Sequence, residues 1–189
     1  MERDRKILEA AAEAFYEKGF HGVGVDELGR RAGLTGPALY RHFSGKDEIL
    51  ATLLNEALDE LIAATVPVRD DPRSDLDRAL RHHIGFAIGH RHLVNIYQRE
   101  VRSLAEPWKK AFDRRRGEYL DGWEALLARC FPGLERERVA AATQACLGMI
   151  FSVSYWPGRR VRGADVTDLL MELLSGGLKS LGGAAISHE

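Results

Sequence analysis

The stretch from residue 35 to residue 46 holds side chains that could hydrogen-bond to a nucleic acid. Leu39 and Phe43 lie four residues apart, so on a helix both would face the core of a small domain. The opposite side then carries Arg41, the one side chain there that can donate two parallel hydrogen bonds to guanine. The rest of that side, with the helix start at which base edges are usually approached, consists of Thr35, Gly36, Pro37 and Ala38.

Three further side chains flank this surface and could contact phosphates. Tyr40 and His42 have polar tips that would fix the position of a duplex without reading its sequence. Lys46 lies in the first turn of the next expected helix, where a cation opposes the helix dipole unless an anion such as phosphate binds there. The alternatives are that Tyr40 is a half-buried aromatic, that His42 is a solvated surface residue, and that Asp47 and Glu48 offset the charge of Lys46.

A crowded group of histidines is the main candidate for a different chemistry. The group is His82, His83, His90 and His92. His83 and His90 are seven residues apart and would share one helix face, but no neighbouring Glu or Cys completes a recognised metal-ligand spacing. The chain also lacks a nucleophile elbow and a dinucleotide fingerprint. We therefore expect a solvated helix face, with no metal, no cofactor, no catalytic residues and no enzymatic activity.

Composition is that of an ordinary folded chain of 189 residues, with 45% hydrophobic and 29% charged residues. The formal charge is -1, and residues 1–46 hold eight Lys and Arg against seven Asp and Glu, so DNA binding would depend on where the charges lie. Cys130 and Cys146 are set in apolar surroundings, which favours core packing in a reducing compartment. The sequence has no membrane-spanning run and no signal peptide, so we expect a cytoplasmic protein without a membrane partner.

Hydrophobic periodicity indicates helices throughout and no sustained two-residue alternation, which predicts an all-α fold. Gly19 and Gly33 are expected to end the first two helices in a left-handed conformation. Ser44 is expected to cap the fourth helix with Asp47 as its acidic partner. The expected helices cover about 3–18, 25–32, 35–43, 46–66, 75–90, 92–104, 107–130, 135–156 and 164–181, with a proline-bearing loop over 67–74.

The run Leu39-Tyr40-Arg41-His42-Phe43, with Lys46 and Leu50 after it, resembles the DNA-binding domain of the TetR family of transcriptional regulators. The similarity covers residues 7–54 and also rests on Ile7, Leu8, Ala10, Ala11, Phe15, Gly19, Val25, Leu28, Ala32 and Gly33. It implies a homodimer, a third helix that reads the groove of a double-stranded DNA operator, and phosphate contacts from Tyr40, His42 and Lys46.

The family resemblance also implies a division of the chain. A three-helix helix-turn-helix DNA-binding domain would occupy residues 1–46, and the helix 46–66 would link it to a helical ligand-sensing and dimerisation domain over residues 47–189. Two residues depart from the family pattern. Gly24 stands where a capping Ser or Thr is usual, and Gly29 stands where Ala is usual, so the second helix is expected to be less rigid.

Two apolar segments of the C-terminal part could form a dimer interface. Residues 136–156 align small side chains on one face, and the last helix carries leucines on more than one face. The small side chains are those of Ala141, Ala145, Gly148 and Ser152. Two such segments from each chain would form a four-helix interface, which would set the reading helices about 34 Å apart on a pseudo-palindromic site.

Aromatic side chains of the C-terminal part are candidates for lining a ligand pocket, although ordinary core packing explains most such residues. They are Tyr97, Trp108, Phe112, Trp123, Phe151, Tyr155 and Trp156. Residues 96–100 and 154–160 resemble family members that respond to acyl-coenzyme A thioesters, in which case Arg159, Arg160 or Arg162 would hold phosphates.

The sequence thus favours a ligand-responsive regulator, by family resemblance a repressor, that a small apolar or acyl-CoA-type effector releases from its operator. The alternative from another class is a helical adaptor that does not bind DNA. An adaptor gives no reason for Tyr40, His42 and Lys46 to share one edge with Arg41.

Overall fold

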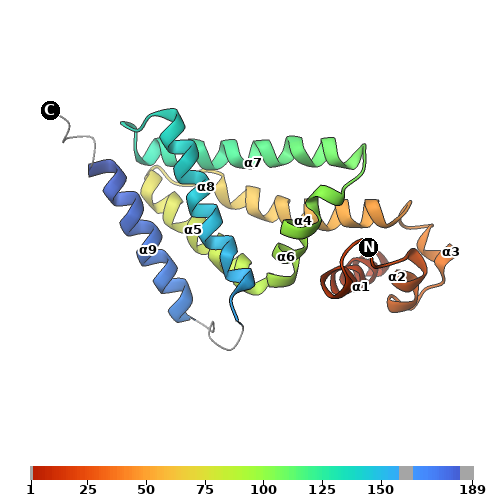
Figure 1. Ribbon diagram of the computed structural model, residues 1–189. Helices are drawn as coiled ribbons and strands as arrows, with labels where there is room; N and C mark the ends of the chain where they lie inside the picture. Colours follow the sequence, from red (N-terminus) through yellow and green to blue (C-terminus); the bar gives the residue numbers. More distant parts are fainter. Residues whose placement is uncertain (1, 158–163, 184–189) are drawn as a thin grey trace. The chain divides into compact units, whose positions relative to one another are not determined.

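The computed structural model describes residues 2–157 and 164–183, and within these residues it is helical with no strand (Figure 1). Two 3-10 helices, η1 (Val101–Ser103) and η2 (Val153–Tyr155), follow α6 and α8. The α-helices are α1 (Glu2–Lys18), α2 (Val25–Arg31), α3 (Gly36–Leu39), α4 (Lys46–Thr65), α5 (Pro72–Gly89), α6 (Arg91–Glu100), α7 (Trp108–Cys130), α8 (Arg136–Ser152) and α9 (Ala164–Gly183). The predicted all-α fold is confirmed.

The helix starts show where the sequence prediction was wrong. α5 begins at Pro72, inside the segment expected to be a loop, because Asp71 caps it by accepting hydrogen bonds from the backbone N–H groups of Arg73 and Ser74. Proline in the first helical turn loses no hydrogen bond, so Pro72 starts this helix and does not break it. At the start of α4, the acidic partner of Ser44 is Glu48 and not Asp47, since Glu48 Oε2 accepts from both Ser44 N and Ser44 Oγ.

Glycines end the first two helices as predicted. Gly19 has a φ of 75° and its N–H donates to the Phe15 carbonyl at 2.9 Å. Gly33 has a φ of 69°, and the bonds from Gly33 N to Arg30 O and from Leu34 N to Gly29 O form a Schellman motif at the end of α2. The left-handed residue at 33 turns the chain sharply into α3, which completes the helix-turn-helix.

Two compact units make up the chain, and each is described by itself. Unit 1 consists of Met1–Asp59 and His92–Arg116, and unit 2 consists of Glu60–Arg91 and Gly117–Glu189. Unit 1 therefore joins α6, η1 and the start of α7 to the helix-turn-helix, which differs from a division at residue 46. The functional boundary between residues 46 and 47 stays a prediction.

Unit 1 has its core where α1, α2 and α3 meet the first half of α4. The buried side chains of α1 include Ile7, Leu8 and Phe15, and Phe20 packs on Phe15 with ring centroids 5.4 Å apart. Leu39 brings α3 onto the same core. The short third helix packs against α2.

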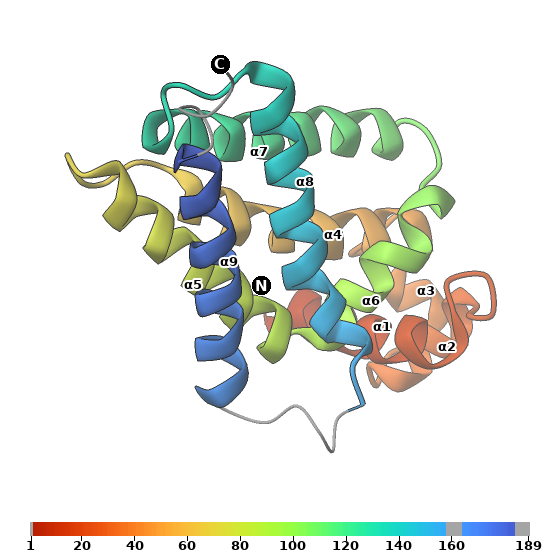
Figure 2. The same ribbon diagram turned by 60° about the vertical axis from the view of Figure 1, so that its left-hand side comes forward.

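In unit 2, α5 packs against α8 and α9, and α8 also packs against α9. Figure 2 shows α8 and α9 side by side on one face of this unit. Among the residues that the structure describes, no helix combines the length and the hydrophobicity that crossing a bilayer requires.

Candidate nucleic-acid interface

A short helix and the turn after it carry the predicted reading residues. Thr35 caps α3, because its Oγ1 accepts from Ala38 N at 3.3 Å, as expected for a helix start. The α-helix ends at Leu39, and the chain continues through turns in which His42 N and Phe43 N both donate to Leu39 O. The third helix is therefore shorter than predicted, and Arg41 and His42 lie in the turn that follows it.

The side chains of this segment divide as the spacing predicted. Leu39 and Phe43 are buried, whereas Thr35, Pro37 and Arg41 are exposed. Tyr40 is 57% exposed, so more than half of its surface is accessible beside Arg41. We call the set Thr35, Gly36, Pro37, Ala38, Tyr40, Arg41 and His42 the reading surface.

His42 is held in place by the first turn of α1. Its Nδ1 lies 2.7 Å from Asp4 Oδ1, and about a quarter of its side chain is exposed, so it is not the freely solvated residue of the alternative interpretation. With Nδ1 directed to a carboxylate, Nε2 is the ring atom left to face a phosphate, and it can donate a hydrogen bond there when the ring is protonated. Asp4 thus orients His42 for the predicted phosphate contact.

Lys46 lies at the start of α4, and its ammonium group is already engaged within unit 1. Nζ donates to Phe20 O at 3.0 Å and to Val23 O at 3.2 Å, and it lies 4.4 Å from the centroid of the Phe20 ring. These contacts anchor the loop between α1 and α2. An ammonium has three N–H donors, so one remains for the phosphate contact proposed from the sequence.

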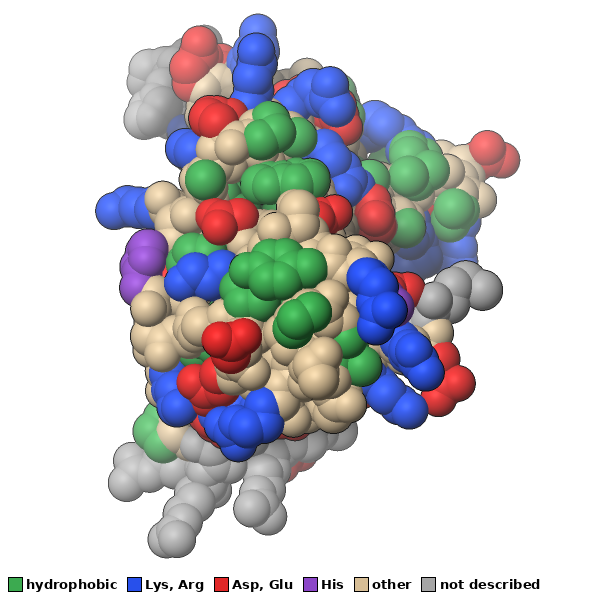
Figure 3. Space-filling model, turned by 90° about the vertical axis from the view of Figure 1, so that its right-hand side faces the viewer, with side chains coloured by type: hydrophobic (Ala, Val, Ile, Leu, Met, Phe, Trp, Pro, Cys, Tyr) green, Lys and Arg blue, Asp and Glu red, His purple; other side chains and the backbone are tan. Residues whose placement is uncertain are grey.

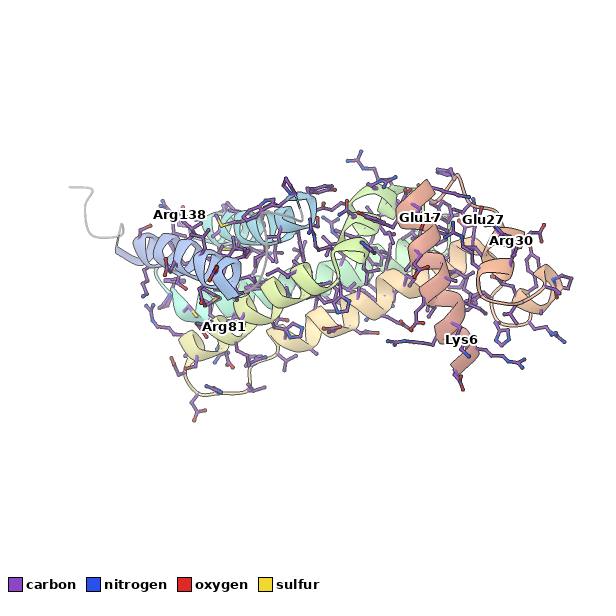
Figure 4. All side chains as sticks on the ribbon, turned by 90° about the horizontal axis from the view of Figure 1, so that it is seen from below. Lys6, Glu17, Glu27, Arg30, Arg81 and Arg138 are labelled. Atoms are coloured by element: carbon purple, nitrogen blue, oxygen red, sulfur yellow. The ribbon has the colours of Figure 1, made fainter. Side chains whose placement is uncertain are left out.

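Positive and negative charges are balanced within the helix-turn-helix region, residues 2–46, which we call the reader. On the described part of the face shown in Figure 3, Lys and Arg side chains are interspersed with Asp and Glu and form no continuous band. Figure 4 shows Glu17 on α1 close to Glu27 on α2. Arg31 bridges the two acids, with Nη2 2.7 Å from Glu17 Oε2 and 3.1 Å from Glu27 Oε1. Lys18 adds a 2.7 Å bond to Glu27. These ion pairs join α1 to α2 and leave few cations available to a nucleic acid.

Three cations of the reader have no intramolecular hydrogen bond or ion pair within the described residues. They are Arg3, Arg30 and Arg41, and all three are exposed. Arg41 belongs to the reading surface, and Arg3 precedes the Asp4 that holds His42. Sequence reasoning missed Arg3 and Arg30, because nothing in a list of charges tells which cations pair with neighbouring acids on folding.

The candidate ligand-binding aromatics fall in both units. Tyr97, Trp108 and Phe112 belong to unit 1, where the rings of Tyr97 and Phe112 lie 6.1 Å apart. The other four, which belong to unit 2, are Trp123, Phe151, Tyr155 and Trp156. Tyr155 is 56% exposed and Trp123 is fully buried. Arg159, Arg160 and Arg162 lie outside the described residues, and the role of the whole group stays a prediction.

His83 is the polar centre of unit 2, which corrects the prediction of a solvated histidine face. It is fully buried, with Nδ1 2.7 Å from Ala79 O and Nε2 accepting a hydrogen bond from Trp123 Nε1 at 3.3 Å. Burial lowers the pKa of His83 to about 4, against the raising effect of the Ala79 hydrogen bond. The ring is therefore neutral, and it cross-links α5 to α7.

The acidic, histidine and cysteine side chains are the groups that could bind a metal ion, and the cysteines could act as thiols. Within the described residues, no group of three or more His, Cys, Asp or Glu side chains is arranged to hold a metal ion. Cys130 and Cys146 are buried and unpaired, as core packing predicts. Burial raises the pKa of both thiols, that of Cys146 to about 11.

Comparison with protein families gives two adjoining matches. The family described as "Bacterial regulatory proteins, tetR family" matches residues 7–53, and "Tetracyclin repressor-like, C-terminal domain" matches residues 69–178, which is more than half of the chain. The chain belongs to the TetR family.

Two curated relatives are similar over part of their length. The HTH-type transcriptional activator FasR of Mycolicibacterium smegmatis is 39% identical over 80 residues, which cover 42% of this chain and 35% of FasR. The HTH-type transcriptional repressor KstR2 of Mycobacterium tuberculosis is 35% identical over 106 residues, which cover 54% of this chain and 53% of KstR2. The chain thus spans about a third of FasR and about half of KstR2.

Among solved structures, AibR in complex with isovaleryl coenzyme A and operator DNA has a TM-score of 0.77 at 24% identity, over 90% of this chain and 97% of AibR. At that identity the likeness establishes the TetR-family fold. The matched family is described as one of bacterial regulatory proteins, so this chain belongs to a family of regulators.

A second set of contacts in unit 1 was missed by sequence reasoning. In this TetR-family regulator α6 and η1 hold the helix-turn-helix: the rings of Tyr16 and His92 stack with centroids 4.0 Å apart, and His21 Nε2 lies 3.1 Å from Ser103 Oγ. Arg99 also donates to the Tyr16 carbonyl. These residues are far apart in sequence and polar or aromatic, so hydrophobic periodicity gives no indication of them.

Proposed function

We propose that this chain is a repressor that binds a pseudo-palindromic operator as a homodimer, and that a small apolar or acyl-CoA-type effector releases it. The observation that carries the proposal is the state of Arg41, which is exposed and, within the described residues, without an intramolecular partner. A guanidinium left free in the turn after a short helix is suited to bidentate pairing with guanine in the major groove.

The neighbours of Arg41 support a close approach to the duplex. Gly36, Pro37 and Ala38 have small side chains, so α3 can lie deep in a groove. Tyr40 is more than half exposed, and His42 keeps Nε2 free of the Asp4 contact that Nδ1 makes, which suits both to phosphates. Base reading by Arg41 and positioning by Tyr40, His42 and Lys46 is therefore the division of roles that we propose.

The dimer proposal is supported by the two faces of α9. Val166, Leu170, Leu174 and Leu178 form a buried stripe, whereas Leu169 and Leu173 are 47% and 52% exposed. On α8, Ala141, Ala145, Gly148 and Met149 are also exposed. Small side chains on one helix beside exposed leucines on its neighbour are what a four-helix interface between two copies requires.

We propose the effector class from a structural neighbour and from the aromatic residues of unit 2. AibR was solved with isovaleryl coenzyme A, which makes acyl-CoA thioesters the first candidates to test. The candidate aromatic residues of unit 2 have apolar side chains of the kind that suits an acyl chain. KstR2 is a repressor and FasR an activator, and the "Tetracyclin repressor-like" match supports repression.

Coupling between ligand and DNA would run through helices shared by the units. α4 and α7 each begin in unit 1 and end in unit 2. Suppose that a ligand binds one conformation of unit 2 more tightly than another by about 1 to 3 kcal/mol. It would then shift the equilibrium between the DNA-binding and released conformations by the same free energy. Release then requires only that the two reading surfaces of the dimer no longer match the spacing of the half-sites.

An electrophoretic shift with the DNA upstream of the chain's own coding region tests DNA binding. We expect a shifted band that unrelated DNA does not compete away at equal concentration. Arg41→Ala should lose discrimination at one base pair of each half-site, worth about 1 to 3 kcal/mol, whereas Tyr40→Phe should weaken binding to all sequences alike. No shift with upstream DNA or with a random duplex library would refute the proposal.

Calorimetry with isovaleryl-CoA and a long-chain acyl-CoA tests the effector class. We expect one of them to bind and to reduce operator affinity, and free coenzyme A serves as the control that lacks the acyl chain. If neither thioester binds, or if binding leaves DNA affinity unchanged, the acyl-CoA proposal is wrong while DNA binding stands.

A further inference from the structure

The carboxylate of Asp26 lies against the start of α3, next to the reading surface. Asp26 is an exposed residue of α2. A methyl group placed on Gly36, the first residue of α3, would overlap Asp26 Oδ1 and lie 3.6 Å from Asp26 Cγ. The missing side chain at Gly36 therefore makes room for this acid, which the family resemblance did not single out.

Asp26 lies outside the hydrogen bonds and ion pairs that the described part of the domain forms. Within the described residues it has no hydrogen bond or ion pair, whereas its neighbour Glu27 binds both Lys18 and Arg31. The competing structural role is a favourable interaction with the dipole of α2, because Asp26 lies in the first turn. That role accounts for an acid at this position but gives no reason for the space that Gly36 leaves over it.

A free carboxylate at a DNA-facing edge repels phosphates, so its useful partners are hydrogen-bond donors. In the major groove such donors are the exocyclic amino groups of the bases, and acids pair with cytosine N4. We propose that Asp26 is a specificity-determining residue that accepts a hydrogen bond from the amino group of a cytosine in each half-site. This inference rests on the proposed DNA binding, and it adds a second base-reading residue, on α2, to Arg41 in the turn after α3.

Selection of binding sequences from a library of duplexes with a random central segment tests the inference. The full-length protein is compared with Asp26→Asn, with Asp26→Ala, and with Glu13→Gln as the control. Glu13 is an exposed acid of α1 that has no partner within the described residues, so its substitution removes the same charge elsewhere in the reader. Thermal unfolding of each variant accompanies the selection, and Asp26→Ala gives a second measurement if Asp26→Asn is unstable.

Wild type and Glu13→Gln should select the same sequence, with a cytosine at one symmetric pair of positions that is preferred about 5- to 150-fold over other bases. Asp26→Ala should lose this preference alone, and Asp26→Asn should lose it or shift it to adenine, which pairs with an amide. The other positions should keep their bases.

Two results would overturn the inference while leaving DNA binding intact. In one, both Asp26 variants select the wild-type sequence. In the other, they bind every duplex more tightly by the same factor, which would mean that Asp26 only repels phosphates. If the wild type itself selects no sequence, the proposed function fails and the inference fails with it.

Discussion

His83 shows at the scale of one residue how burial fixes a protonation state. Both ring nitrogens are occupied in a neutral ring, and the folded pKa of about 4 lies below the ordinary value of 6.5. On acidification the unfolded chain therefore binds a proton before the folded chain does. The stability that neutral His83 contributes is complete above pH 6.5 and is lost as the pH falls toward 4.

We expect the free energy of unfolding to fall by about 3 kcal/mol across this window, measured by urea denaturation at a series of pH values. His83→Gln should flatten the pH dependence, whereas His90→Gln, at an exposed histidine that caps the same helix, should keep it. Asp75 titrates in a lower range: burial opposes ionisation, but hydrogen bonds from Val68, Arg69 and Arg78 hold its pKa below 3.8. Equal slopes in the wild type and His83→Gln would contradict this account.

The burial or exposure of single residues could be predicted from the sequence where it depends on the spacing of residues along a helix. Leu39 and Phe43 are buried and Arg41 is exposed, as their positions on one turn require. The prediction was wrong for His83, although Ala79, Leu80 and Ile84 around it mark a buried helix stripe that includes position 83. Sequence reasoning could not find the partners of Lys46 or His42, because the Phe20 and Val23 carbonyls and Asp4 lie 23 or more residues away.

At the scale of elements, the turn between α2 and α3 sets the angle at which the reading surface is presented. Its left-handed residue is Gly33, and a Cβ there would meet no atom within 4 Å, so any cost of a side chain comes from the backbone alone. Gly33→Ala should lower the free energy of unfolding by about 1 kcal/mol.

Gly85 is a matched control for this substitution. It lies exposed in the interior of α5, again with open space around its Cα. Gly85→Ala should therefore stabilise the protein by about 0.5 to 1 kcal/mol, since alanine is the better helix former. Denaturant unfolding measures both changes, and a Gly33→Ala variant as stable as the wild type would contradict the assigned role of the turn.

Helix positions were predictable because apolar periodicity and glycine stops are local properties. The exceptions also have local causes: Asp71 captures two backbone N–H groups and starts α5 at a proline, and α3 closes after one turn. The grouping of α6 and η1 with the helix-turn-helix in unit 1 was beyond prediction, since it depends on contacts such as Tyr16 with His92.

For the whole molecule, binding of a two-fold operator requires that two copies assemble, and we propose that they do so through α8 and α9. Leu173→Glu places a charge on the exposed leucine face of α9, and we expect sedimentation to change from dimer to monomer with loss of operator binding. Val68→Glu is the matched control, because Val68 is 63% exposed but lies between α4 and α5. A Leu173→Glu variant that stays dimeric would remove α9 from the interface.

A crystal structure of the dimer on its selected duplex would show whether the reading surface binds the major groove. We predict Arg41 within hydrogen-bonding distance of guanine O6 and N7, with Tyr40 and His42 against phosphates. A complex in which residues 35–42 face away from the duplex would contradict this prediction.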